Sequence, residues 1–172
     1  MIYLAYGSNI NLEQMAFRCP HSKVIGTAEI KDYELEFRGV ATIVPKEGAT
    51  VPILVWDLDK RDLPSMNRYE GYPRLYCQEI LDFQVDGKTK KGMAYLMNYG
   101  EKAVPSRRYY NTILQGYREN GLDVSFLKQA FDNAVEYENQ KYEEDEDYDE
   151  DYDEDEDEDE DFDFLDGFQL KI

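Results

Sequence analysis

Apolar and polar residues alternate in short runs over the first half of the chain, which is typical of β-strands. We predict strands at residues 2–6, 24–30, 33–37, 41–44, 51–57, 75–85 and 92–97. Polar links separate them at Lys31-Asp32, at residues 45–48 and at Asp86-Gly87, and the last pair is a favoured hairpin turn. Several short antiparallel strands of this kind favour a compact barrel or a strongly bent sheet.

Helical periodicity replaces the alternation elsewhere in the chain. Residues 12–18 follow the first strand as a helix, and Asp59 caps a second helix that ends near Tyr69. Ser106 caps a third helix, which ends at Asn120-Gly121, and a fourth opens at Asp123. We expect the last two helices to cover the barrel. The predicted fold class is therefore α+β: a small mixed, mostly antiparallel β-barrel with flanking helices.

The charge of the chain is concentrated at its C-terminal end. The formal net charge is −19 over 172 residues, and residues 143–166 hold 19 of the 38 acidic residues without any Lys or Arg. Residues 1–142 are close to neutral, with a net charge of −1. Dense like charge and little apolar surface disfavour a packed fold. We predict one domain at residues 1–141 and a disordered, low-complexity acidic tail at residues 142–172.

The role of this tail stays open. An EF-hand is excluded, because Gly167 is the only glycine there and the ligand spacing is missing. Residues 162–172 mix acidic with large apolar side chains, so they could dock on a basic protein partner. The alternative is a solubilising tail, or one that folds back on the domain.

Several classes of site and location are disfavoured by composition. Cys19 and Cys77 lack metal-ligand spacing, and the single histidine, His21, cannot build a Ser-His-Asp triad or a multi-histidine site. No secretory signal, membrane-spanning run or nucleic-acid-binding basic patch is apparent. We expect a soluble cytoplasmic protein without metal or cofactor, which does not bind membranes or nucleic acids; its oligomeric state stays open.

The first strand ends in a loop of small residues, Tyr6-Gly7-Ser8-Asn9, before the helix at 12–18. Such a loop lets backbone approach a ligand, and its N–H groups suit an anion such as a carboxylate. An ordinary turn is the alternative reading. Ser8 has no histidine to activate it, so we expect it to form hydrogen bonds and not to act as a nucleophile.

Glu70 is the candidate acid/base. It lies at the expected end of a short helix with Tyr69, Tyr72 and Tyr76 nearby. Poor solvation among aromatic rings raises a carboxyl pKa, which suits proton transfer near neutrality. A solvated surface glutamate is the alternative. Tyr109 could offer its hydroxyl to a ligand or belong to the core, whereas Arg107 and Arg108 read as solvated charges at a helix start.

The motifs together resemble the gamma-glutamylcyclotransferase-like family. The residues that carry the resemblance run in order over about 1–135: Tyr3 to Asn9, Ala41 to Ile43, Val55-Trp56, Tyr69 to Gly71, Ala94 to Met97, Pro105 to Tyr109 and Arg118 to Leu122. The last two are similar to gamma-glutamylcyclotransferase proper. A departure, Met66-Asn67 where the family often has Leu-Asp, lies outside the expected contacts.

The resemblance implies a fold and an activity. The fold is a small mixed barrel with flanking helices, and the activity is cofactor-independent release of 5-oxoproline from small γ-glutamyl compounds. Glu70 would be the acid/base and Tyr109 a ligand contact. The substrate loop would be formed by Tyr3, Leu4, Ala5, Tyr6, Gly7 and Ser8.

Three functions stay open from the sequence. The first is a cyclotransferase acting on γ-glutamyl amino acids or on γ-glutamyl-ε-lysine, and Asn9 disfavours a glutathione-specific enzyme. The second is a tailoring enzyme that removes a γ-glutamyl group from a biosynthetic intermediate. The third is a non-enzymatic interaction protein that works through its acidic tail.

Overall fold

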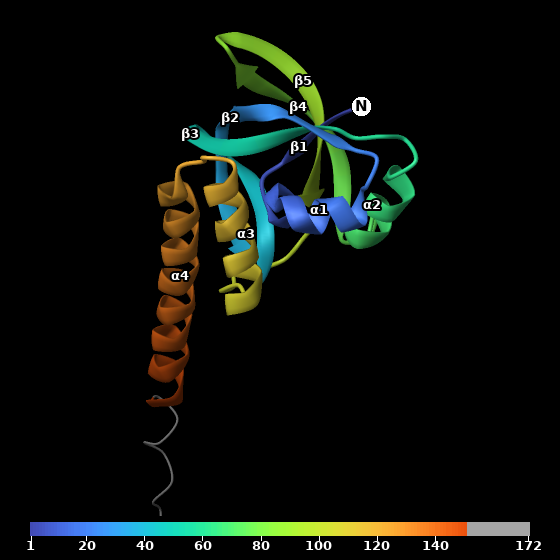
Figure 1. The fold of residues 1–172 in the computed structure, drawn as a ribbon. Coiled ribbons are helices and arrows are strands. Elements are labelled where there is room, and N and C mark those ends of the chain that lie inside the picture. Colours follow the sequence, from blue (N-terminus) through green and yellow to red (C-terminus); the bar gives the residue numbers. More distant parts are fainter. Residues whose placement is uncertain (151–172) are drawn as a thin grey trace, which may run out of the picture.

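The computed structural model describes residues 1–150, with side chains described up to residue 143, and Figure 1 shows the fold. The elements follow in the order β1 (Ile2–Ala5), the 3-10 helix η1 (Ser8–Ile10), α1 (Leu12–Arg18), β2 (Lys23–Arg38), β3 (Val40–Asp57), α2 (Leu63–Tyr69), β4 (Tyr76–Val85), β5 (Lys88–Met97), α3 (Arg107–Glu119) and α4 (Val124–Glu150).

The five strands close into a barrel in the order β1-β3-β2-β4-β5. Neighbouring strands are antiparallel except β1 and β5, which run parallel and meet at Tyr3 and Met93. The hairpin predicted around Asp86-Gly87 joins β4 to β5. This barrel with its flanking helices confirms the predicted fold class.

Two of the predicted breaks between strands are wrong. β2 runs through Lys31-Asp32 and β3 runs through residues 45–48, and the two strands pair along almost their full length. Asp32 adopts a positive φ of 60° where the register shifts, so it makes an irregularity within the strand. The polar residues there face solvent, and the Asp32 carboxylate accepts a hydrogen bond from Gly48 N at 2.9 Å. A break in the apolar pattern therefore marked exposed pairing, not a turn.

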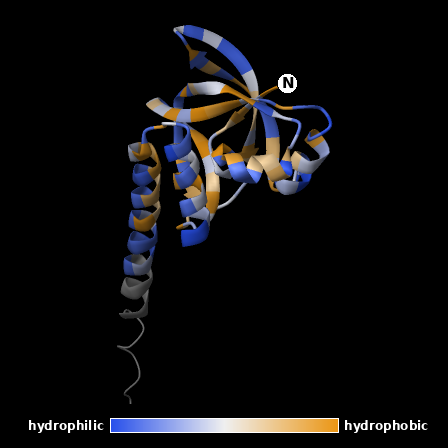
Figure 2. Ribbon diagram, viewed as in Figure 1, coloured by the Kyte–Doolittle hydropathy of each residue, from blue (hydrophilic) through white to orange (hydrophobic). Residues whose placement is uncertain are grey.

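The core fills the barrel and continues under the helices. Leu4, Phe37, Ile53 and Met93 are among its buried side chains. In Figure 2, apolar and polar residues alternate along α3 and α4, as expected of helices that bury one face. α3 and α4 lie side by side (Figure 1). They pack on the sheet through an aromatic cluster, in which the centre of the Tyr110 ring lies 6.3 Å from that of Phe37 and 5.0 Å from that of Phe131.

The cap predicted for the second helix is also wrong, since Asp62 precedes α2 in place of Asp59. Asp59 instead binds Arg61. The buried Asp62 carboxylate accepts hydrogen bonds from His21 N at 2.9 Å and from Ser22 Oγ at 2.8 Å. Tertiary partners from the loop after α1 therefore decide where α2 begins.

The predicted domain boundary at residue 141 falls inside α4, which continues to Glu150. A helix that is already nucleated extends at low cost through good helix formers such as Glu. The rest of the predicted tail, residues 151–172, lies outside the described residues. Within residues 1–150, no helix combines the length and apolarity needed to cross a bilayer.

Candidate active site

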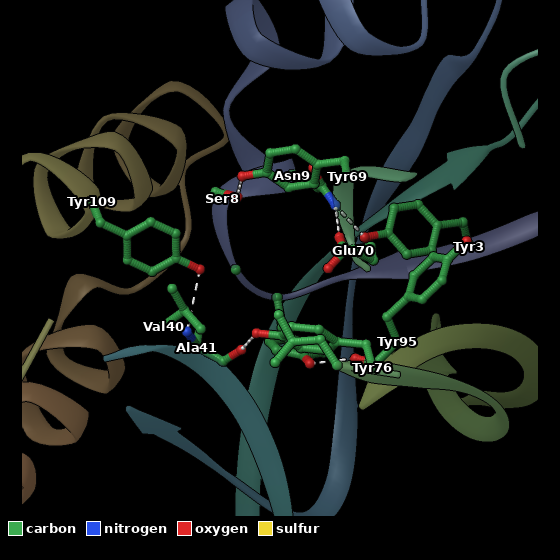
Figure 3. Close-up of a pocket in the computed structure, with 13 residues that line it drawn as sticks. Tyr3, Ser8, Asn9, Val40, Ala41, Tyr69, Glu70, Tyr76, Tyr95 and Tyr109 are labelled. Carbon is green, nitrogen blue, oxygen red and sulfur yellow. Dashed lines mark hydrogen bonds between the residues drawn. The ribbon is translucent and has the colours of Figure 1, made fainter. Parts of the chain in front are cut away.

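A cavity of about 260 Å³ opens where the β1–η1 loop meets the end of α2, the strands β3, β4 and β5, and α3. We call it the active-site cavity, and Figure 3 shows its lining. The lining residues are Tyr3, Tyr6, Gly7, Ser8, Asn9, Val40, Ala41, Tyr69, Glu70, Leu75, Tyr76, Tyr95 and Tyr109. Six of the thirteen are tyrosines, so nearly half of the lining residues are aromatic and carry a hydroxyl group.

Glu70 is the acid of this cavity. It caps the C-terminus of α2, where its N–H donates to Met66 O at 2.9 Å, and its side chain turns into the cavity (Figure 3). The residue is only 9% exposed. Burial disfavours the charged form and raises the pKa of Glu70 from 4.5 to about 7, although the Asn9 hydrogen bond and the Arg18 charge oppose the rise.

Asn9 connects the loop to this acid. Its Nδ2 donates to Glu70 Oε1 at 2.7 Å and to the Tyr3 hydroxyl at 2.7 Å. The Arg18 guanidinium donates to Asn9 Oδ1, which fixes the amide with its NH2 group toward the carboxylate. The two sequence-separated motifs that suggested a shared site are therefore joined directly.

Arg18 was not predicted as a site residue. It ends α1, and its guanidinium lies 3.2 Å from the centre of the Tyr69 ring, a cation–π contact. Gln14 Oε1 accepts a further hydrogen bond from it at 3.1 Å. The available signal was weak: Arg18 is the only basic residue of the predicted helix at 12–18.

Tyr109 closes the opposite side of the cavity (Figure 3). Its hydroxyl accepts a hydrogen bond from Ala41 N at 3.2 Å, and burial raises its pKa to about 12, so it is a neutral phenol at physiological pH. A Cβ at Gly7 would lie 3.3 Å from Ala41 Cβ and 3.4 Å from the Tyr109 hydroxyl. Glycine at position 7 thus lets the loop backbone come close to both.

Ser8 meets a phenol and not a base. Its Oγ lies 2.8 Å from the Tyr69 hydroxyl, and the residue is buried. This contact is compatible with the predicted hydrogen-bonding role, which stays a prediction.

Most of the predicted site residues meet in the cavity. Tyr3, Tyr6, Gly7, Ser8, Glu70 and Tyr109 all line it. Leu4 and Ala5 do not line it: they belong to β1, and their side chains are buried in the core. Sequence reasoning left the role of Asn9 open and did not assign Tyr95 a role, although Tyr95 stands in one of the motifs that carried the family resemblance.

The Met66-Asn67 departure lies nearer to the site than the sequence suggested. Asn67 Oδ1 accepts hydrogen bonds from the Tyr95 hydroxyl at 2.5 Å and from Gln78 Nε2 at 2.8 Å. Tyr95 is itself a wall of the cavity. Asn67 therefore does not line the cavity itself but holds one of its lining residues, Tyr95.

No group of three or more His, Cys, Asp or Glu side chains in the described part of the chain is arranged to hold a metal ion. The polar atoms that reach the cavity are one carboxylate, one amide, one serine hydroxyl and several phenols. Such a set can bind a polar ligand and move a proton.

Comparison with known proteins agrees with this arrangement. Residues 3–112 match the family described as gamma-glutamyl cyclotransferase, AIG2-like. The chain is 31% identical to the gamma-glutamylcyclotransferases of Bos taurus, over 163 residues, and Homo sapiens, over 165 residues; each alignment covers 85% of this chain and 86% of the relative. A solved structure titled gamma-glutamyl cyclotransferase superposes with a TM-score of 0.69 at 28% identity, covering 76% of this chain and 85% of that one. This chain therefore belongs to the gamma-glutamyl cyclotransferase, AIG2-like family.

Proposed function

We propose that the protein is a gamma-glutamylcyclotransferase that releases 5-oxoproline and a free amine from small γ-glutamyl compounds. The observation that carries this proposal is the contact between Glu70 and Asn9 inside one cavity. It joins an acid with a pKa near neutrality to a loop suited to a carboxylate. The family relatives carry the same activity in their names.

The size and lining of the cavity suit the glutamyl half of such a substrate. A volume of about 260 Å³ lies below the range of drug-sized pockets, which is roughly 300–1,000 Å³. The loop at Gly7 and Ser8 offers backbone N–H groups at the start of η1 for the substrate α-carboxylate or the developing oxyanion. Tyr109 faces the loop and adds a hydroxyl contact.

Glu70 has one carboxylate oxygen free for the reaction. Among the described residues, the hydrogen bond to this carboxylate involves Oε1, and Oε2 remains for the substrate. A pKa of about 7 leaves a substantial carboxylate fraction at neutral pH, and the conjugate acid is strong enough to return a proton. The same group can therefore serve as base and then as acid.

The reaction then follows from intramolecular geometry. The Glu70 carboxylate takes a proton from the substrate α-ammonium, and the freed amine attacks the γ-carbonyl carbon to form a five-membered lactam. The attacking nitrogen loses a second proton as the lactam forms, and the bond from the γ-carbonyl carbon to the leaving nitrogen breaks. Glu70 passes both protons in turn to this nitrogen, so the amine leaves as an ammonium ion. Holding the near-attack geometry contributes on the order of 7–11 kcal/mol, and a placed proton shuttle contributes about 10²–10⁴-fold.

The division of the chain, its location and its partners are part of the proposal. We place the catalytic unit in residues 1–141 and treat residues 142–172 as an acidic appendage that could meet a basic protein partner. The near-neutral charge of residues 1–142 supports this division. A cytoplasmic location is consistent with the two free cysteines, Cys19 and Cys77.

The direct test is product release. The full chain is incubated with γ-glutamyl amino acids, γ-glutamyl-ε-lysine and glutathione, and 5-oxoproline is measured by chromatography. We expect release from the small γ-glutamyl amines and much slower turnover of glutathione. Absence of 5-oxoproline with every substrate would contradict the proposal.

A further inference from the structure

A second hollow lies beside the active-site cavity, between α1 and α3. This outer groove encloses about 760 Å³. Tyr69 and Tyr109 line both hollows. The two hollows therefore share a wall at these two rings.

The two helices are held together at one end of the groove. A Cβ at Gly116 of α3 would lie 2.8 Å from Asn11 N, so only glycine permits this close approach. Asn11 Nδ2 also donates to Thr112 O at 3.2 Å. The groove lies toward the N-terminus of α3, where Ser106, Arg108 and Tyr109 contribute to its wall.

The charged groups of the groove differ in their freedom. The Arg18 guanidinium is committed to Asn9, Gln14 and the Tyr69 ring. Arg108 is exposed, and its guanidinium makes no ion pair or hydrogen bond with any described residue. Glu13 is the one acid of the lining and is also exposed without such a partner. Among the described residues, Arg108 is thus the cation of the groove that is available to a ligand.

We propose that the outer groove binds the leaving amine of the substrate and that Arg108 recognises a free carboxylate on it. This inference rests on the function proposed above. A γ-glutamyl amino acid carries its second carboxylate on the carbon next to the scissile nitrogen, just outside the glutamyl half. The planar guanidinium of arginine can bind a carboxylate through two parallel hydrogen bonds. Arg108 is therefore the residue that distinguishes a leaving amine with a free carboxylate from one without it.

An apolar surface accompanies this cation in the groove. Phe17 of α1 is 92% exposed and belongs to the lining. Contact between the Phe17 ring and the side chain of a leaving amino acid is favourable, because it removes apolar surface from water. We expect leaving amino acids with apolar side chains to be favoured over glycine.

The test compares two substrates that differ in one charge, γ-glutamyl-alanine and its C-terminal amide. We measure kcat/KM for 5-oxoproline release with the wild type, Arg108→Gln and Arg107→Gln. The wild type should prefer the acid by about fivefold, the size of a partly exposed ion pair, and this preference should shrink at high salt. Arg108→Gln should bring the ratio of acid to amide close to one.

Arg107→Gln is the matched control, because Arg107 is exposed on the same turn of α3 and does not line the groove. It should keep the ratio of the wild type. An equal rate with acid and amide in the wild type, or an unchanged ratio in Arg108→Gln, would overturn the role of Arg108 while the proposed function stands. Absence of 5-oxoproline from both substrates would overturn the proposed function together with this inference.

Discussion

The active-site cavity and the outer groove share two tyrosines but differ in how far their charged side chains are paired within the protein. In the cavity, the side chains of Tyr3, Ser8 and Glu70 have hydrogen-bond partners within the protein. In the groove, Glu13 and the Arg108 guanidinium have none among the described residues. Paired groups keep their orientation, which suits a fixed chemical step. Charged side chains without a partner can move to meet different ligands, which suits a site that accepts different leaving amines.

The largest effect is expected from removing the carboxylic acid of Glu70 in the active-site cavity. Glu70→Gln keeps the shape and can still accept the Asn9 hydrogen bond, but it cannot take a proton. We expect kcat for 5-oxoproline release to fall by about 10²–10⁴-fold, with a circular dichroism spectrum like that of the wild type. Full turnover by this variant would end the role of Glu70.

The same variant has an expected effect on stability. Burial raises the folded pKa of Glu70 to about 7, above its usual 4.5, so the wild type loses stability as pH rises from about 4.5 through 7. The loss reaches about 3 kcal/mol at pH 8. Denaturant unfolding at pH 4.5 and pH 8 should show a smaller loss for Glu70→Gln. Identical pH profiles would contradict the buried, shifted carboxyl.

Arg18 lines the outer groove and donates a hydrogen bond to Asn9 of the active-site cavity, so its removal tests whether the fixed orientation of Asn9 matters. Arg18→Gln removes a charge that lowers the pKa of Glu70 and a donor that orients Asn9. We expect kcat to fall about tenfold. The acidic limb of the pH–rate profile, near pH 7 in the wild type, should move to higher pH.

Arg68→Gln is the control for this charge change, since Arg68 is exposed on α2 and lines neither hollow. It should keep the wild-type profile. Arg18→Lys retains the charge and should restore the limb in part, although a point charge replaces the planar group. An unmoved limb in Arg18→Gln would show that Arg18 serves packing alone.

Tyr109 lines both the active-site cavity and the outer groove. Removal of its hydroxyl tests whether this group contributes to substrate binding. Tyr109→Phe should raise KM about three- to tenfold with little change in kcat, because one hydrogen-bonding group is lost. Tyr110→Phe is the matched control: Tyr110 packs against Phe37 and Phe131 and does not line the cavity. An unchanged KM in Tyr109→Phe would count against substrate contact.

The smallest effect is expected outside both hollows. Glu138 Oε1 accepts a hydrogen bond from Val104 N at 2.7 Å, and Lys141 pairs with Glu101 at 2.9 Å, so these contacts of α4 precede residue 143. Deletion of residues 143–172 should leave kcat/KM for small substrates within about twofold. A large loss of turnover would place part of the machinery in the acidic segment.

Local signals in the sequence predicted several elements well. Ser106 caps α3 and accepts a hydrogen bond from Tyr109 N at 3.3 Å, as a side chain of that type does before a helix. The hairpin around Asp86-Gly87 also follows from local chemistry. The unbroken course of β2 and β3 could not be predicted in this way, because their exposed polar stretches carry no apolar pattern while the backbone still pairs.

By itself, the sequence indicated a small mixed barrel, the resemblance to the family and the two motifs that supply the loop and Glu70, because the alternation within each strand and the residues of each motif are local in the chain. Only the tertiary structure decided that Asn9 contacts Glu70 across 61 positions and that Arg18 orients this amide. It also decided that a groove lies beside the cavity, in which Arg108 has no ion-pair partner among the described residues. These contacts depend on how the barrel closes and how α1 and α3 pack on it. Long-range packing of this kind leaves no periodic mark on the chain.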